Sequence, residues 1–216
     1  MHSLPAPQHA VAADGRRTRS GRLKMLAVLA VCLTPIVASY FSYYVARPEG
    51  QRNFGELVEQ RPVPALAAIN LEGAPVALSA LKGQWLLVSA GGGACDARCE
   101  NHLYLQRQLR EALGKEKGRL DWVWLVTDGA PLRPELLAAT RQATVLRVEE
   151  AQLASWLTPA AGRQLADHLY VVDPMGHWMM RFPDGLDLAG AGKARRDLER
   201  LLRASSSWDQ PGRANP

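Results

Sequence analysis

An uncharged apolar run near the N-terminus constrains the organisation of this chain more than any other sequence feature. The run covers residues 25–45, MLAVLAVCLTPIVASYFSYYV, and contains no Asp, Glu, Lys or Arg. Because a helix rises about 1.5 Å per residue, about 20 such residues cross the roughly 30 Å hydrocarbon core of a bilayer. The run therefore predicts one transmembrane helix. A cleaved signal peptide is the alternative, but its apolar part spans only about 7 to 15 residues.

The charges on either side of the run predict its orientation. Five basic residues precede it: Arg16, Arg17, Arg19, Arg22 and Lys24. Only Arg47 and Arg52 follow it closely. Because Lys and Arg stay on the cytoplasmic side, residues 1–24 are predicted to form a basic, disordered cytoplasmic tail. The rest of the chain is then expected in the periplasm, held at the cell inner membrane.

The same tail explains the basic composition of the chain. The net charge is +5, and the tail contributes most of it because its five basic residues face the single acid Asp14. A nucleic-acid-binding protein would need its positive charge on the folded part. No nucleic-acid partner is therefore predicted.

The remaining residues predict one α/β domain between two irregular segments. Residues 46–63 are expected to be a linker, 64–204 the domain, and 205–216 a disordered tail. Apolar runs predict strands at 85–90, 122–127, 144–148, 169–172 and 178–182. Helical patterns lie at 100–113, 133–140, 151–156 and 193–202. This alternation favours a parallel core, and the Asp-Pro-Met-Gly turn at 173–176 favours a final hairpin. A thioredoxin-like domain with a mixed central sheet satisfies both.

Two cysteines lie where the first core strand is expected to give way to a helix. The segment 91–99 reads GGGACDARC. A helix N-terminus lowers the pKa of a nearby thiol, so Cys95 is predicted to be the more reactive cysteine. If the helix begins near Cys95, then Cys99 and His102 share its face, and this face could hold copper or a disulfide. The competing interpretation is two small buried hydrophobes, and Cys32 is expected only to pack in the membrane.

Other prominent side chains receive structural interpretations. Asp128 follows a predicted strand and is expected to cap a turn or helix. Trp122, Trp124 and Trp178 lie on predicted strands and are expected in the core.

Several motifs resemble the SCO/SenC family, membrane-anchored thioredoxin-like proteins of cytochrome c oxidase assembly. The matching stretches are Leu81-Lys82-Gly83, the Cys95-x3-Cys99 pair, Val126-Thr127-Asp128, Arg133-Pro134-Glu135-Leu136-Leu137, and Tyr170-Val171-Val172-Asp173-Pro174-Met175-Gly176. Asp96 and Glu100 stand where the family has prolines, so the chain is identified as a divergent member.

The resemblance implies a copper site made by Cys95, Cys99 and His168. His102 and His177 are alternative third ligands. The implied function is that of an assembly factor which binds copper, or exchanges thiols for disulfides, through the cysteine pair. Its partner would be a cytochrome c oxidase subunit or another copper or thiol client.

Two other functions remain open at this point. In the first, Cys95 attacks a substrate disulfide and Cys99 resolves the intermediate, as in a thiol-disulfide oxidoreductase. In the second, the domain is a non-catalytic interaction module that keeps the fold without the chemistry.

Overall fold

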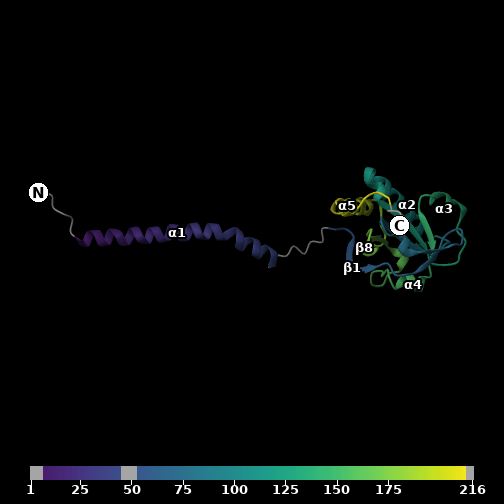
Figure 1. The fold of residues 1–216 in the computed structure, drawn as a ribbon, viewed down its shortest axis with the longest axis horizontal. Coiled ribbons are helices and arrows are strands. Elements are labelled where there is room, and N and C mark those ends of the chain that lie inside the picture. Colours follow the sequence, from purple (N-terminus) through teal and green to yellow (C-terminus); the bar gives the residue numbers. More distant parts are fainter. Residues whose placement is uncertain (1–6, 45–52, 213–216) are drawn as a thin grey trace. The chain divides into compact units, whose positions relative to one another are not determined.

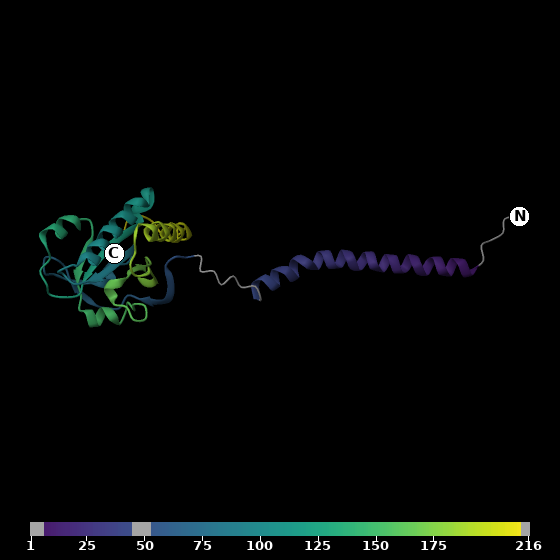
Figure 2. The ribbon, with the colours of Figure 1, turned by 180° about the vertical axis from the view of Figure 1, so that it is seen from behind.

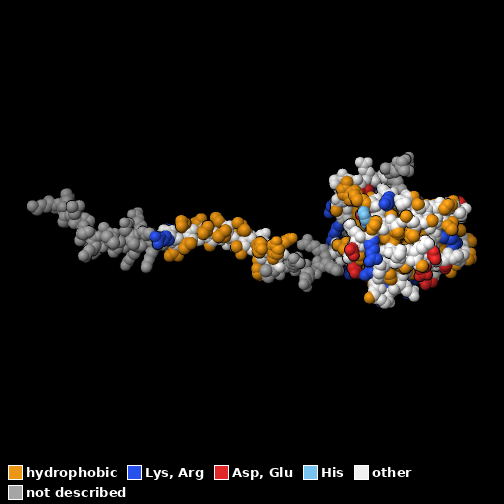
Figure 3. Space-filling model, turned by 60° about the horizontal axis from the view of Figure 1, so that its bottom comes forward, with side chains coloured by type: hydrophobic (Ala, Val, Ile, Leu, Met, Phe, Trp, Pro, Cys, Tyr) orange, Lys and Arg blue, Asp and Glu red, His pale blue; other side chains and the backbone are white. Residues whose placement is uncertain are grey.

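The computed structural model describes residues 7–44 and 53–212, with side chains from residue 20 onward. The chain forms two compact units that divide at residue 51, and each is described by itself. The first unit contains the helix α1 (Pro7–Tyr44). Its segment Ser20–Tyr44 is long and apolar enough to span a membrane, and none of that apolar window is buried within the protein. Figure 3 shows hydrophobic side chains along this part of α1.

The helix begins earlier than expected. Residues 7–24 are helical rather than disordered, because α1 continues from the apolar run into the basic segment. Pro35 lies inside α1 without ending it.

The second unit is built on a mixed eight-stranded sheet of order β1-β8-β7-β4-β5-β6-β2-β3 (Figure 1). The strands are β1 (Glu56–Pro62), β2 (Ala67–Ile69), β3 (Pro75–Ala77), β4 (Trp85–Gly91), β5 (Leu120–Val126), β6 (Thr144–Arg147), β7 (Leu169–Val172) and β8 (His177–Arg181). The central strands β4, β5 and β6 are parallel, and β7, β8 and β1 add antiparallel strands on one side. The prediction of a parallel core with a final hairpin is confirmed.

Helices cover both faces of the sheet. The α-helices are α2 (Ala97–Ala112), α3 (Pro134–Ala139), α4 (Glu150–Ala154) and α5 (Leu188–Ala204), and the 3-10 turns are η1 (Leu78–Leu81), η2 (Gly114–Arg119) and η3 (Leu165–Asp167). Figures 1 and 2 show α2 and α5 on one side of the sheet and α4 on the other.

Two apolar clusters fill the spaces between these layers. One joins β4 side chains such as Leu87 to α2 and α5, and the other joins Val88 and Val123 to α4. All seven residues of β4 are buried, which suits a strand with helices over both faces. The three tryptophans expected in the core, Trp122, Trp124 and Trp178, are all buried.

The folded domain begins before the predicted boundary at residue 64. Residues 56–62, predicted as linker, form the edge strand β1, in which Glu56 lies opposite Arg181. The backbone N–H groups of Phe54 and Gly55 donate to one carboxylate oxygen of Asp197, at 2.7 and 2.9 Å. Asp197 is a buried residue of α5, so these bonds tie the start of the domain to its last helix.

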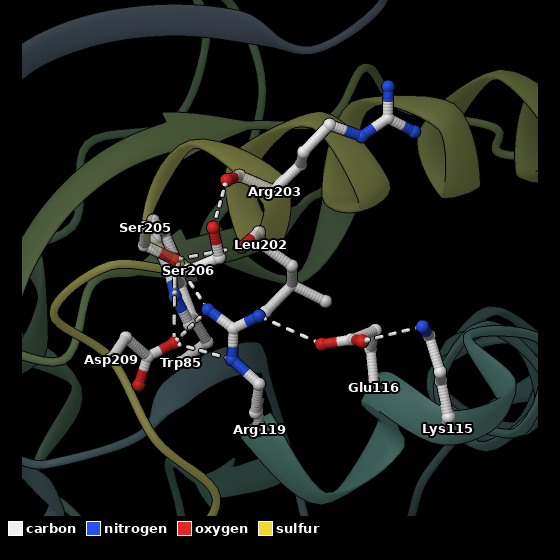
Figure 4. Close-up of polar contacts among 9 residues, drawn as sticks. All are labelled: Trp85, Lys115, Glu116, Arg119, Leu202, Arg203, Ser205, Ser206 and Asp209. Carbon is white, nitrogen blue, oxygen red and sulfur yellow. Dashed lines mark hydrogen bonds and ion pairs between the residues drawn. The ribbon is translucent and has the colours of Figure 1, made fainter.

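The domain also extends past the predicted boundary at residue 204. Residues 205–209, predicted as part of a disordered tail, fold back onto the buried guanidinium of Arg119 (Figure 4). Nη2 of Arg119 donates to Asp209 at 2.7 Å and to Ser205 Oγ at 2.8 Å, and Nη1 pairs with Glu116 at 2.8 Å. Trp85 Nε1 donates to the same hydroxyl at 3.1 Å. The segment therefore joins α5, η2 and the first residue of β4.

We predict that Asp209→Ala lowers the free energy of unfolding by about 3 kcal/mol, because it removes the buried carboxylate of Arg119 and leaves only the partly exposed Glu116 as its ionic partner. Asp184→Ala breaks a comparable pair with Arg163, but both of those side chains are about half exposed. This control substitution should lower the free energy of unfolding by less than about 1 kcal/mol. Urea denaturation of the full chain, followed by tryptophan fluorescence, measures both; equal losses would contradict the role given to Asp209.

Candidate redox site

The loop that follows β4 is held against the loop that follows β5. The backbone N–H of Gly93 donates to Asp128 Oδ1 at 2.8 Å, and Ala130 N–H donates to the same oxygen at 3.1 Å. Asp128 thus caps a turn, as expected. A Cβ on Gly92 would lie 2.5 Å from Asp128 Oδ2, and one on Gly93 would lie 2.5 Å from the carbonyl oxygen of Ala130. The two glycines therefore permit a close approach that a side chain would prevent.

Cys95 and Cys99 are joined in a disulfide at the end of this loop, with their Cα atoms 5.1 Å apart. Cys95 has a positive φ of 47°, the only such value among the described residues other than glycine. Its N–H donates to the carbonyl oxygen of Gly92 at 3.1 Å. Cys95 is only 5% exposed and packs in a cluster with Leu103 and Trp124, whereas Cys99 is partly buried at the margin of that cluster.

The helix α2 begins at Ala97, three residues before the predicted helical pattern at 100–113 but two residues after the start near Cys95 that a shared face requires. Asp96 is its N-cap, and the Asp96 carboxylate accepts a hydrogen bond from Cys99 N–H at 2.9 Å. Cys95 therefore lies outside the helix and Cys99 lies in its first turn. The expected helical face shared by Cys95, Cys99 and His102 does not form.

A buried amide fixes α2 on the sheet beneath it. Nε2 of Gln106 donates to the carbonyl oxygens of Leu87 at 2.7 Å and Val123 at 3.1 Å. Its Oε1 accepts from Ser89 Oγ at 3.0 Å. Since Gln106 is completely buried, these bonds lock the position of α2, and with it Cys99, relative to β4 and β5.

The two residues that flank Cys99 in the sequence, Arg98 and Glu100, each form an ion pair. Arg133 pairs with Glu100 and also donates to the carbonyl oxygen of Cys95 at 3.0 Å. Arg98 pairs with Asp167, whose side chain is almost fully buried at the end of η3. The charge of Glu100, which stands where the SCO/SenC family has a proline, is therefore balanced by Arg133. No local sequence signal indicates these pairs, because the two members of each lie more than 30 residues apart along the chain.

His168, the predicted third copper ligand, is occupied by other contacts. Its Nδ1 lies 2.9 Å from the carbonyl oxygen of Phe182, and its Nε2 accepts from Ala160 N–H at 3.1 Å. These contacts require the neutral tautomer with the proton on Nδ1. Burial lowers the pKa of His168, which favours the same neutral form.

The two alternative ligands do not complete a metal site either. His177 lies at the β7–β8 turn, where it is bonded to Asp173 at 3.2 Å. His102 is a buried residue of α2. Desolvation, followed by the charges of Arg98 and His168, lowers its pKa to about 4. Among the side chains described, those of residues 20–44 and 53–212, no three His, Cys, Asp or Glu residues are grouped to hold a metal ion. The predicted set of Cys95, Cys99 and His168 therefore does not fit copper in this conformation.

Comparison with protein families matches both units of the chain. Residues 85–205 match the family described as transmembrane-like, thioredoxin-like, C-terminal domain, and residues 15–46 match its transmembrane-like N-terminal domain. The chain belongs to this transmembrane-like, thioredoxin-like family. The N-terminal match and the apolar helix together support a single-pass membrane protein. No curated protein matches the sequence.

Solved structures share the fold of this family member. A SCO1/SenC family lipoprotein from Bacillus anthracis is 16% identical, with a TM-score of 0.51 over 68% of this chain and 98% of its own. Yeast Sco1 with copper bound is 12% identical, with a TM-score of 0.50 over 72% and 96%. The thioredoxin domain of a thiol-disulfide oxidoreductase from Bacteroides vulgatus is 18% identical, with a TM-score of 0.48 over 68% and 99%. The family match, together with the Bacillus anthracis and yeast structures, shows that the domain is thioredoxin-like, as predicted.

We predict that His102 makes the stability of the domain depend on pH. In the unfolded chain its imidazole takes up a proton near pH 6.5, whereas in the folded protein it does so only near pH 4. The unfolded state therefore binds more protons between these values, and stability is lost as the pH falls through this window. From pH 7 to pH 5, His102 should lower the free energy of unfolding by about 2 kcal/mol.

Urea denaturation of wild type and His102→Gln at the two pH values tests this dependence. From pH 7 to pH 5, the free energy of unfolding of His102→Gln should fall by about 2 kcal/mol less than that of the wild type. The fall that remains comes from other titratable groups. Damage to packing would shift the stability at both pH values equally, so the difference between them isolates the proton effect. An unchanged difference in His102→Gln would contradict the prediction.

Proposed function

We propose that this protein is a membrane-anchored thiol-disulfide exchange protein whose redox couple is Cys95 and Cys99. The observation that carries the proposal is the bond between these two sulfurs where β4 ends and α2 begins. Ligand and reaction sites of open α/β sheets lie beyond the carboxyl ends of parallel strands, which is where this bond lies. The disulfide also fits an oxidising compartment, in which such bonds persist.

We infer the client and the location of the protein from the motifs that resemble the SCO/SenC family. We infer that the domain faces the periplasm from the inner membrane, with the basic N-terminal segment in the cytoplasm. We infer further that the protein acts in assembly of a respiratory copper oxidase, on cysteines of a cytochrome c oxidase subunit or of another copper or thiol client. The support is the Cys-x3-Cys spacing at 95–99, the turn at 173–176 and the fold shared with the Bacillus anthracis and yeast proteins.

Copper transfer is the second candidate, and the proximity of the two sulfurs favours it. Thiolates are the ligands that Cu(I) prefers, so a reduced pair offers two suitable donors to copper as cargo. The oxidised pair offers none, because each sulfur is bonded to the other. His168 would have to release both Phe182 and Ala160 before it could act as a third ligand.

We predict one reversible two-electron transition for the cysteine pair in the full chain. The experiment uses the Cys32→Ser protein in detergent, so that only Cys95 and Cys99 react. The protein is equilibrated with glutathione buffers of graded potential, and free thiols are then alkylated and counted by mass spectrometry. Both thiols should appear together as the buffer becomes more reducing. When the reduced protein is mixed with insulin, the dithiol should be oxidised to the disulfide as the insulin disulfides are reduced.

This experiment, with a parallel anaerobic incubation of the reduced protein with Cu(I), has three outcomes that separate the candidate functions. A reversible transition with insulin reduction supports thiol-disulfide exchange. Cu(I) that is retained by the reduced protein, but lost in both Cys95→Ser and Cys99→Ser, supports copper transfer. A pair that neither equilibrates with glutathione nor retains Cu(I) would overturn both proposals and leave an interaction domain.

A further inference from the structure

We propose that Cys99, rather than Cys95, is the sulfur that forms the mixed disulfide with a client, and that Cys95 is the buried resolving cysteine. This inference rests on the proposed thiol-disulfide exchange and specifies its order. It reverses the order expected from the sequence, in which the first cysteine of the pair was the attacking thiol.

Burial is the first argument for this order. Cys95 exposes 5% of its surface and is enclosed by an apolar cluster that includes Leu103, Trp124 and Leu136. Cys99 is partly exposed and lies at the margin of the same cluster. Thiol-disulfide exchange needs an in-line approach to the attacked sulfur, so access decides which sulfur reacts. The pair is therefore more accessible to a client on the side of Cys99.

The backbone provides a second, independent argument. The Cys95 backbone is held by its own N–H bond to Gly92 and by the Arg133 bond to its carbonyl oxygen, at 3.1 and 3.0 Å. A residue tied in this way, with a positive φ, cannot move outward without breaking both bonds. Cys99 instead lies in the first turn of α2, which Gln106 holds in place, and it is the more exposed residue of the pair.

In the direction in which Cys99 attacks a client disulfide, the charge on the attacking sulfur supports the same order. A thiolate on Cys99 would lie in the first turn of a 16-residue helix, where the helix dipole favours negative charge. A thiolate on Cys95 would be enclosed by the apolar cluster, which disfavours its charge, so Cys95 is the poorer attacking thiol.

The exchange can be written with all electrons accounted for. A client thiolate attacks Cys99 Sγ, the Cys95–Cys99 bond breaks, and its electron pair passes to Cys95 Sγ, which then takes a proton. A second client thiolate attacks the client sulfur of the mixed disulfide and releases Cys99 as a thiolate. The client leaves with a disulfide and the protein as a dithiol. In the opposite direction Cys99 attacks a client disulfide, and Cys95 then displaces the client by attacking Cys99 Sγ.

Two single-cysteine proteins test the order. Both are full chains with Cys32→Ser; one adds Cys95→Ser, which leaves Cys99, and the other adds Cys99→Ser, which leaves Cys95. Each is mixed with an aromatic disulfide reagent, and release of the coloured thiol is followed over time. We expect the protein that retains Cys99 to react at least about tenfold faster, because reactivity follows exposure and thiolate character.

The same reaction in denaturing urea is the matched control. Unfolding removes the difference in burial, so the two rates should converge if the folded structure causes the difference. Faster or equal reaction of Cys95 in the folded proteins would overturn the inference. If the wild-type pair still equilibrates with glutathione in that case, only the order is wrong. If it does not equilibrate, the proposed function fails as well.

Discussion

The covalent bond between Cys95 and Cys99 is the interaction on which the arrangement of the site depends. It joins the loop after β4 to the first turn of α2, and the surrounding contacts hold its two sides in place. Gly92 and Gly93 allow the loop to lie against the Asp128 turn, while Asp96 caps the helix that carries Cys99. None of these groups is itself a nucleophile. Their common effect is a rigid frame in which one sulfur is buried and the other is partly accessible.

Buried polar groups connect this frame to the rest of the domain. Gln106 fixes α2 on the central strands, and Asp197 fixes the start of the domain on α5. Arg119 and Asp209 close the C-terminal segment over η2. Each of these groups is buried and hydrogen-bonded, so the loss of one partner leaves an unsatisfied polar atom or charge in a dry environment. These contacts extend the folded domain beyond the boundaries that its apolar runs indicate, to residues before 64 and after 204.

The parts of the structure that could be predicted from the sequence are those whose signal is local. Apolar runs indicated the spanning helix and the core strands, and the turn at 173–176 indicated the final hairpin. The edge strand β1 was missed because its sequence ELVEQRP is polar and exposed, and because its residue Glu56 pairs with Arg181, 125 residues further along the chain. The ion pairs around the cysteines and the contacts of His168 also join distant parts of the chain. The start of α2 differs from these features because a local signal could have indicated it. An Asp such as Asp96 before a helical pattern is a recognisable N-cap.

The proposed chemistry requires that the Cys95–Cys99 bond opens and closes as the protein works in its membrane. Acid quenching of cells that produce the full Cys32→Ser chain, followed by alkylation, measures the fraction of the pair that is reduced. A pulse of membrane-permeant dithiol should reduce the bond. After the dithiol is removed, disulfides present in the same compartment should oxidise the pair again within minutes. A pair that stays fully oxidised throughout the pulse, while the protein remains folded, would contradict this requirement.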